Sequence, residues 1–249
     1  LRKHIFNVLD VPENVPLTTK QKIQMEALRT RKPHVSKDQI DEFLRSLVYP
    51  LYFLDFETFG TAIPLLDNVH PFQQVPFQFS LHVVRSQGGN PEHYGFLAED
   101  ASEPRPELLG RLRSLLGDRG SIVSYNIVFE KGRLKECAAV FKEFESWHQG
   151  VAVRFVDLMQ PFRKFAYYHP EQKGSASIKS VLPALTGNGY DQLEIADGGT
   201  ASLEYLRVTY QDVDSTERLR VRKLLEEYCK MDTLAMVRIV ESLHELLII

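Results

Sequence analysis

The stretch 51–58 places Asp55 and Glu57 two residues apart in an otherwise apolar and aromatic run. A run of this length, bounded by Pro50 and Gly60, predicts a buried strand. Because side chains alternate along a strand, both carboxylates emerge on one face. Two like charges this close repel and are costly to remove from water, so they share a proton, are covered by basic side chains or hold a divalent cation. Carboxylate oxygens suit magnesium or manganese.

Two later segments carry further acidic residues on predicted helices. After a short apolar strand at 121–125, Glu130 lies in the first turn of a helix, where an acidic side chain suits the helix dipole. Tyr228 and Asp232 are four residues apart in a strongly helical stretch, so both project from one helix face. One strand and two helices could therefore bring four carboxylates together.

These segments resemble the three motifs of the DEDD 3′-to-5′ exonucleases, a superfamily with an RNase H-like fold that includes the proofreading domains of DNA polymerases. In chain order the motifs occur here as Asp55-x-Glu57, Asn126-x-x-Phe-Glu130 and Tyr228-x-x-x-Asp232. The chain is similar to the tyrosine variant, since the histidine variant has His where this chain has Glu227. It looks most like an uncharacterised bacterial group in which this module follows a PD-(D/E)xK nuclease-like domain.

The resemblance implies a metal-dependent exonuclease that cleaves phosphodiester bonds of DNA or RNA with two divalent cations, Mg²⁺ or Mn²⁺, about 3.5 to 4 Å apart. It implies that Asp55 bridges both ions and that Glu57 and Asp232 complete the water-activating site. Glu130 then reaches the second ion directly or through water, and the Tyr228 hydroxyl orients the attacking water. The superfamily usually has Asp at the position of Glu130, and the additional methylene could shift a metal.

A single-stranded 3′ end of nucleic acid is the expected partner, and four residues are expected to contact it. Thr58 and Asn126 belong to the first two motifs. Phe56 could stack a terminal base or pack in the core. Lys179 ends the small, polar and basic segment 173–179, whose backbone N–H groups could cradle a phosphate. An ordinary helix N-cap at one of its serines is an equally good interpretation.

The rest of the pattern predicts an α/β architecture. Strands are expected at 51–58, 75–83, 92–97, 121–125 and 154–158, with the main helices between them at 106–116 and 129–144. Strands first in a run and then alternating with helices make a sheet covered on both faces. Together with the resemblance, this predicts an RNase H-like mixed five-stranded sheet flanked by helices, followed from residue 161 by a chiefly helical chain.

We expect two parts, an N-terminal linker with helices at 1–48 and the RNase H-like exonuclease domain at 49–249. Up to Asp38 the chain holds eight Lys and Arg against four Asp and Glu, and it includes a helix at 19–30. This segment is a basic arm on nucleic acid or a solvated linker helix. A capping-box pattern at 36–39 begins a second helix. The chain begins with Leu, so it could be a fragment of a longer protein in which a nuclease-like domain precedes it.

Composition narrows the class of protein. A net charge of −3 excludes an electrostatic nucleic-acid binder like a histone, so any phosphate binding must be local. Cys137 and Cys229 have no C-x-x-C spacing, which argues against a zinc site or a disulfide framework and fits two buried thiols in a reducing cytoplasm. No apolar run approaches the ~18 residues of a membrane span. We therefore expect a cytoplasmic protein with no membrane partner.

Two other functions stay open. One is a non-catalytic nucleic-acid-binding or assembly module on the same fold, which Glu130 in place of Asp and the weak basic character both favour. The other is a two-carboxylate hydrolase such as a glycosidase, which needs an acid and a base but neither a fourth acid nor a helix tyrosine. Metal dependence distinguishes the exonuclease from both.

Overall fold

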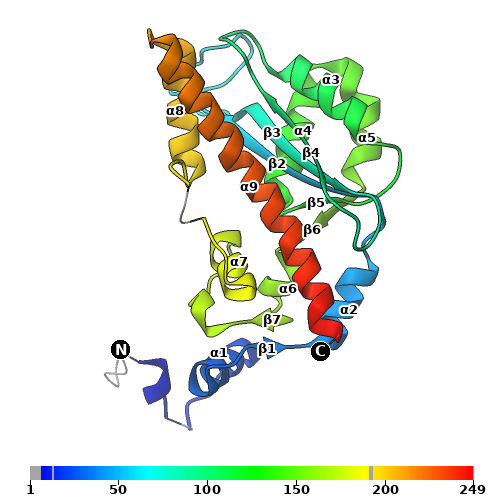
Figure 1. Ribbon diagram of the computed structural model, residues 1–249, viewed down its shortest axis with the longest axis vertical. Coiled ribbons are helices and arrows are strands. Elements are labelled where there is room, and N and C mark those ends of the chain that lie inside the picture. The colour runs from blue at the N-terminus through cyan, green and yellow to red at the C-terminus, as the bar shows by residue number, and fades with distance from the viewer. Residues whose placement is uncertain (1–6, 13, 191–192, 249) are drawn as a thin grey trace. The chain divides into compact units, whose positions relative to one another are not determined.

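The structure, a computed structural model, describes residues 7–12, 14–190 and 193–248 (Figure 1). These residues form two compact units. We call the first, which comprises residues 47–158 and the described part of 190–237, the five-stranded unit. The second, the two-stranded unit, comprises the described residues of 1–46, 159–189 and 238–249. The division falls within the long helix α9 (Ser215–Ile248), after Val237.

The five-stranded unit is built on one mixed sheet. Its strands are β2 (Leu51–Phe59), β3 (Val75–Val84), β4 (Glu92–Leu97), β5 (Ile122–Ser124) and β6 (Phe155–Asp157). Their order is β4-β3-β2-β5-β6; the first three form an antiparallel meander, whereas β5 runs parallel to β2 and β6 parallel to β5. This confirms the predicted α/β fold with a mixed five-stranded sheet in an RNase H-like arrangement.

The central strand β2 carries the two carboxylates of the first motif. All its residues except Asp55 are buried, as expected for a strand that is covered on both faces. The antiparallel register places Asp55 opposite Ser80 and Glu57 opposite Gln78. Because residues directly opposite one another share a face, these four side chains form a polar row on one face of the sheet.

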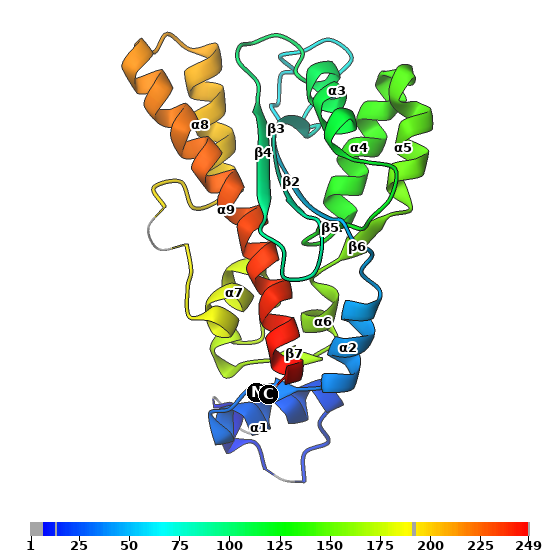
Figure 2. The ribbon, with the colours of Figure 1, turned by 45° about the vertical axis from the view of Figure 1, so that its right-hand side comes forward.

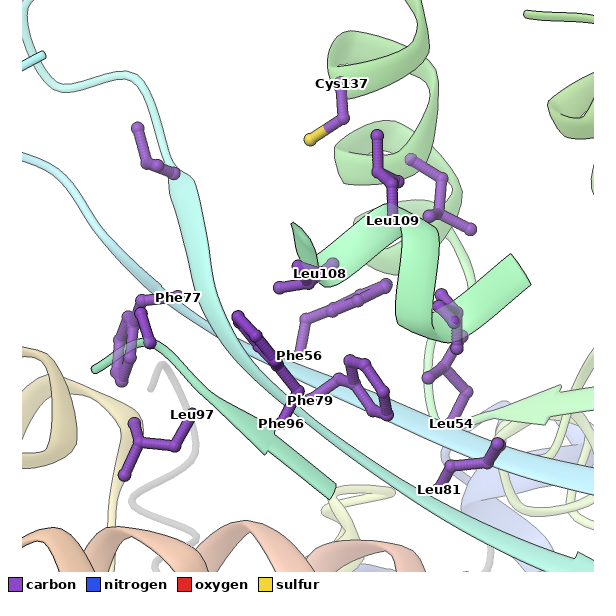
Figure 3. Close-up of a cluster of buried hydrophobic side chains, with 14 of the residues drawn as sticks. Leu54, Phe56, Phe77, Phe79, Leu81, Phe96, Leu97, Leu108, Leu109 and Cys137 are labelled. Atoms are coloured by element: carbon purple, nitrogen blue, oxygen red, sulfur yellow. The ribbon is translucent and has the colours of Figure 1, made fainter. Parts of the chain in front are cut away.

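The other face of the sheet carries the apolar core. Figure 3 shows Leu54 and Phe56 of β2 beside Phe79 and Leu81 of β3, with Leu108 and Leu109 of α3 (Arg105–Leu115) and Cys137 of α4 (Val128–Val140) over them. Leu112 of α3 is fully buried as well, whereas Leu115, at the end of the helix, is half-buried. Alternate residues along β2 therefore face two environments, the apolar core on one side of the sheet and the polar row on the other.

The prediction of one continuous helix at 129–144 is wrong at its C-terminal end. The helix α4 ends at Val140 and is followed by the 3-10 turn η2 (Lys142–Phe144) and a separate helix α5 (Glu145–Ala152). Phe141 leaves the helical region, with φ −101° and ψ 87°, and its ring centroid lies 5.3 Å from the guanidinium carbon of the buried Arg105. The end of α4 thus coincides with a cation–π contact to a residue far away in the sequence.

Two helices cover the face of the sheet that carries Asp55. They are α8 (Gly198–Tyr210) and the N-terminal part of α9, on the side of the sheet opposite α3 and α4 (Figures 1 and 2). Gln78 Nε2 donates to the Leu225 carbonyl oxygen at 2.9 Å, and the hydroxyl oxygens of Ser80 and Thr233 are 2.7 Å apart. These buried polar contacts fix α9 along β3.

The two-stranded unit pairs two very short strands, β1 (His34–Val35) and β7 (Tyr167–Tyr168), in antiparallel fashion. Its helices are η1 (Val8–Asp10), α1 (Thr19–Thr30), α2 (Lys37–Arg45), α6 (Gln160–Arg163), η3 (Pro170–Gln172) and α7 (Ile178–Thr186). The helix predicted at 19–30 is confirmed, while β7 interrupts the chiefly helical chain expected after residue 161. Residues 1–6 and 13 of the predicted linker lie outside the described residues.

The capping box predicted at 36–39 does not form. Ser36 precedes α2, but its side chain makes no capping hydrogen bond. A capping box requires Gln39 to accept the backbone N–H of Ser36, and that N–H instead donates to the carbonyl oxygen of Ala166 at 2.7 Å. Capping boxes of this unit occur instead at Thr18 and Gln21, at the start of α1, and at His169 and Gln172, at the start of η3. Among the described helices, none is long and apolar enough to cross a membrane.

Candidate metal centre

The centre begins on the C-terminal half of β2. Asp55 and Glu57 project from one face, as strand alternation predicts, and one oxygen of each lies within 4.8 Å of the other and of the Cys229 Sγ on α9. Glu57 is 6% exposed, whereas Asp55 keeps more contact with solvent. Within the described residues, this is the one group of three or more His, Cys, Asp and Glu side chains that could hold a metal ion.

The electrostatics of Asp55 show that several carboxylates meet here. Burial by the surrounding atoms raises the pKa of Asp55 well above its ordinary value, although the side chain keeps some solvent contact. The charges of Asp232, Glu57 and Glu130 raise this pKa further, and a hydrogen bond to the backbone of Phe56 lowers it. A bound divalent cation would reverse this balance, because it favours the ionised form of every carboxylate around it.

Glu130 reaches the centre from the end of the parallel strand β5. Asn126 adopts a left-handed conformation with φ 74°, which turns the chain from β5 into α4, and its backbone N–H donates to Asp157 Oδ1 at 3.1 Å. Glu130 then lies in the first turn of α4 and is 3% exposed. The region beyond the carboxyl ends of parallel strands is where α/β sheets bind their ligands.

The carboxylate of Glu130 has an unsatisfied atom. Its Oε2 is buried and accepts no hydrogen bond from any residue that the structure describes. Burial raises the pKa of Glu130 to about 8, and the charge of Asp157 acts in the same direction, whereas a backbone hydrogen bond and the Arg133 charge oppose the rise. A buried acceptor without a donor is costly, and it is the kind of atom that a cation would ligate.

The helix α9 supplies Tyr228 and Asp232 from one face, as their spacing predicts. Both are buried, with exposed fractions of 4% and 9%. Burial raises the pKa of Tyr228 far above its ordinary value, and the charges of Asp232, Glu57 and Asp55 together with a hydrogen bond to Asp232 raise it further. The third motif therefore meets the first across the sheet face, and the phenol stays protonated.

A cleft of about 650 Å³ opens beside Glu57 and Glu130. Its lining includes Glu57, Thr58, Asn126, Glu130 and the first residues of α8, Gly198 and Gly199. A Cβ atom at Gly198 would lie 3.3 Å from Glu57 Oε2, so glycine lets the start of α8 approach the carboxylate closely. The hydroxyl of Thr58 donates to Gln74 Oε1 at 2.7 Å, which orients one wall of the cleft.

The structure thus gathers the five residues of the three motifs around Asp55, and it places Thr58 and Asn126 on the adjoining cleft. The group whose ligand atoms all lie within 4.8 Å of one another, however, contains Asp55, Glu57 and Cys229 without Glu130 or Asp232. Phe56 also borders this cleft, but it is 4% exposed and belongs to the buried cluster, which favours its interpretation as a core residue. Lys179 is exposed in the first turn of α7, in the two-stranded unit. Ser177 is the N-cap residue of α7, and its side chain makes no capping hydrogen bond.

Sequence reasoning missed two side chains of the centre. Burial raises the pKa of Tyr190, and both the charge of Asp232 and a hydrogen bond to it contribute. No periodic pattern surrounds Tyr190, so nothing in the sequence marks it. Cys229 and Cys137 are free and buried, as expected. Yet Cys229 lies three residues before Asp232, and helical spacing alone could have placed its thiol on the same face.

The donor set fits a hard divalent cation. Asp55, Glu57, Glu130 and Asp232 offer carboxylate oxygens, the ligands that Mg²⁺ and Mn²⁺ prefer. The unsatisfied Oε2 of Glu130 and the mutual repulsion at Asp55 are both relieved by such an ion. The residues present are therefore consistent with the cofactor that the motifs imply.

Comparison with known proteins places the chain in a family. The family model described as Domain of unknown function (DUF2779) matches residues 52–177, about half of the chain. The chain belongs to this family. The DUF2779 match contains Asp55, Glu57 and Glu130 and ends before Tyr228 and Asp232, so it covers the first two motifs but not the third.

Two curated relatives of this DUF2779 chain are uncharacterized proteins of mycoplasmas. The protein MG366 of Mycoplasma genitalium is 25% identical, in a match that covers 92% of this chain and 37% of MG366. The MG366 homolog of Mycoplasma pneumoniae is 26% identical, over 75% of this chain and 31% of that protein. The chain therefore spans about a third of the length of these relatives. No solved structure matches the chain.

Proposed function

We propose that this chain is a metal-dependent 3′-to-5′ exonuclease that cleaves phosphodiester bonds of DNA or RNA. The observation that carries the proposal is the convergence of four carboxylates and a buried tyrosine hydroxyl from β2, α4 and α9. They converge in the chain order of the three DEDD exonuclease motifs, on the element types that those motifs require. A chance occurrence of three separate patterns would not be expected to produce one electrostatically coupled group.

Two Mg²⁺ or Mn²⁺ ions are the proposed cofactor, held by Asp55, Glu57, Asp232 and Glu130. When bound, such a pair supplies Lewis acidity at the phosphodiester and stabilises the charge of the leaving oxygen. The longer side chain of Glu130 does not argue against this role. Its Oε2 is the buried acceptor without a donor, which supports Glu130 as a ligand.

The remaining roles belong to side chains that do not ligate the metal. Because burial and the carboxylates keep the Tyr228 phenol protonated, it can orient a water molecule by hydrogen bonding but cannot act as a general base. Thr58 and Asn126 line the cleft beside the carboxylates, which supports them as proposed contacts to the nucleotide. The single-stranded 3′ end of a nucleic acid is the proposed substrate, and Lys179 is kept as a proposed phosphate contact.

The proposal also covers the setting of the enzyme. An N-terminal nuclease-like domain is the proposed partner in a longer protein, and the mycoplasma relatives extend far enough beyond the matched region to hold further domains. The cytoplasm is the proposed compartment, which is supported by two free, buried cysteines.

Digestion of a 5′-labelled single-stranded oligonucleotide, with Mn²⁺ or with a chelator, tests the proposal. We expect labelled products that shorten from the 3′ end only when the metal is present, and no digestion of an oligonucleotide whose 3′ end is blocked. Asp55→Asn should abolish digestion. Asp212→Asn, the same substitution at an exposed position, should leave it unchanged and serves as the matched control.

Two results would contradict the proposal. Normal digestion by Asp55→Asn would exclude Asp55 as the ligand shared by both ions. Oligonucleotide binding without digestion, in a protein that Mn²⁺ stabilises, would instead indicate a non-catalytic nucleic-acid-binding module on the same fold.

A further inference from the structure

The thiol of Cys229 lies beside two carboxylates of the candidate metal centre. Cys229 is fully buried, and its Sγ lies within 4.8 Å of one oxygen of Asp55 and one of Glu57. Sulfur is a poor ligand for magnesium and manganese ions, because these ions prefer oxygen ligands. Zinc and its heavier relative cadmium, in contrast, bind thiolate and carboxylate ligands together.

The separations suit a small tetrahedral site. In such a site Zn–S is about 2.3 Å and Zn–O about 2.0 to 2.2 Å, so neighbouring ligand atoms are about 3.5 Å apart. The three atoms here are at most 4.8 Å apart. Each pair needs to close by no more than about 1.3 Å, which rotamer adjustments of two carboxylates and a thiol can supply.

A second observation points to a cation at the same place. Glu130 is 3% exposed, and its Oε2 accepts no hydrogen bond from a described residue. Glu130 and Glu57 line one cleft, and the charge of Glu130 acts on Asp55, so this acceptor lies near the three ligand atoms. Glu130 is not part of the group whose ligand atoms all lie within 4.8 Å of one another, so its side chain would have to move toward the ion to become a fourth ligand.

We propose that a thiophilic divalent cation of the Zn²⁺ class binds to Asp55, Glu57 and Cys229, displaces the hard ions and thereby switches the centre off. A metal–sulfur bond forms, the thiol proton leaves to solvent, and no group is oxidised or reduced. The binding part stands on the three side chains alone, whereas the inhibitory part rests on the proposed exonuclease function. This inference revises the sequence-based expectation that the chain has no zinc site.

Cadmium titration of the whole chain tests the inference directly, because Cd²⁺ bound to a thiolate gives a charge-transfer absorption band in the ultraviolet. We expect the band in the wild type and its absence in Cys229→Ala. Cys137→Ala is the matched control, since Cys137 is equally a buried, free cysteine but lies in the apolar core (Figure 3). That variant should keep the band.

Affinity provides an independent measure. Cys229→Ala should weaken Cd²⁺ binding at least about tenfold while it changes the Mn²⁺-dependent rise in melting temperature little, because only the soft ion uses sulfur. Retained Mn²⁺ stabilisation also shows that the variant is folded. Asp55→Asn, which keeps the thiol, should weaken Cd²⁺ binding as well, since it removes a carboxylate ligand.

The outcomes separate this inference from the proposed function. A Cd²⁺ band that persists in Cys229→Ala, or no band in a wild type that Mn²⁺ stabilises, overturns the inference and leaves the exonuclease proposal standing. A Cys229-dependent band in a protein that neither binds Mn²⁺ nor digests oligonucleotides supports the thiophilic site and overturns the exonuclease proposal. If both the thiophilic site and the exonuclease function hold, Zn²⁺ should inhibit Mn²⁺-dependent digestion, and Cys229→Ala should relieve the inhibition.

Discussion

Removing the charge of Glu130 should stabilise the metal-free protein, although the same change should destroy the proposed activity. The pKa of this carboxyl is raised from 4.5 to about 8, mainly by burial. Because the raised value belongs to the folded state, the folded protein binds the proton more tightly than the unfolded chain does. The stability that this group contributes is therefore fully present below pH 4.5 and is lost as the pH rises towards 8.

The magnitude follows from proton linkage. Each pH unit between the two pKa values costs about 1.4 kcal/mol of the free energy of unfolding, so at pH 7 the loss is about 3 kcal/mol. Glu130→Gln has nearly the same shape as the protonated carboxyl and does not titrate in this range. At pH 7 it should be more stable than the wild type by about that amount, which corresponds to a melting temperature higher by roughly 6 to 12 °C.

Fluorescence of the single tryptophan, Trp147, is the suitable probe, since this residue packs against the core of the five-stranded unit. Melting curves in a chelating buffer at pH 5 and pH 7 should show the two proteins diverging as the pH rises. Glu107→Gln is the matched control: Glu107 also lies in the first turn of a helix, α3, but is exposed. Parallel pH profiles for the wild type and Glu130→Gln would refute the reasoning.

Three further outcomes concern the metal and the proposed reaction. Millimolar Mn²⁺ should raise the melting temperature of the wild type by mass action, and Asp55→Asn should lose this rise; an unchanged wild-type melting temperature would count heavily against the centre. Glu130→Asp should retain part of the oligonucleotide digestion that Glu130→Gln abolishes, because the charge survives and only the reach changes. A Glu130→Gln variant that digests at the wild-type rate in a timed gel assay would exclude a ligand role for Glu130. Tyr228→Phe should lower turnover while Mn²⁺ affinity stays near the wild-type value, since the hydroxyl acts mainly in the transition state. A large loss of Mn²⁺ affinity in that variant would show that Tyr228 supports the ligands instead.

Local pattern predicted the sheet and most of the centre because the signals involved are local. Alternation along β2 and β3 specifies which face each side chain joins, and helical spacing specifies the common face of Tyr228 and Asp232. The motifs that carry the resemblance lie on these regular elements. Their convergence required only that the elements pack as an RNase H-like sheet.

The errors arose where a distant residue decides a local choice. The N–H of Ser36 is taken by Ala166 from another part of the chain, so the expected capping box cannot close. Phe141 leaves its helix beside Arg105, which precedes it by more than thirty residues. Tyr190 lies in a segment without periodicity, and only the folded chain brings its hydroxyl near Asp232. None of these partners can be identified from neighbouring sequence.

The placement of Asp232 on α9 has a consequence for synthesis of the protein. Asp55 and Glu57 leave the ribosome first, Glu130 follows, and Asp232, about 180 residues after Asp55, is the last carboxylate of the set to be added. Until α9 packs along β3 through Gln78 and Ser80, a nascent chain has an open sheet face and an incomplete ligand set. If the proposed function holds, the nuclease would stay silent until α9 is in place, so a chain that stops before Asp232 could not attack nucleic acid.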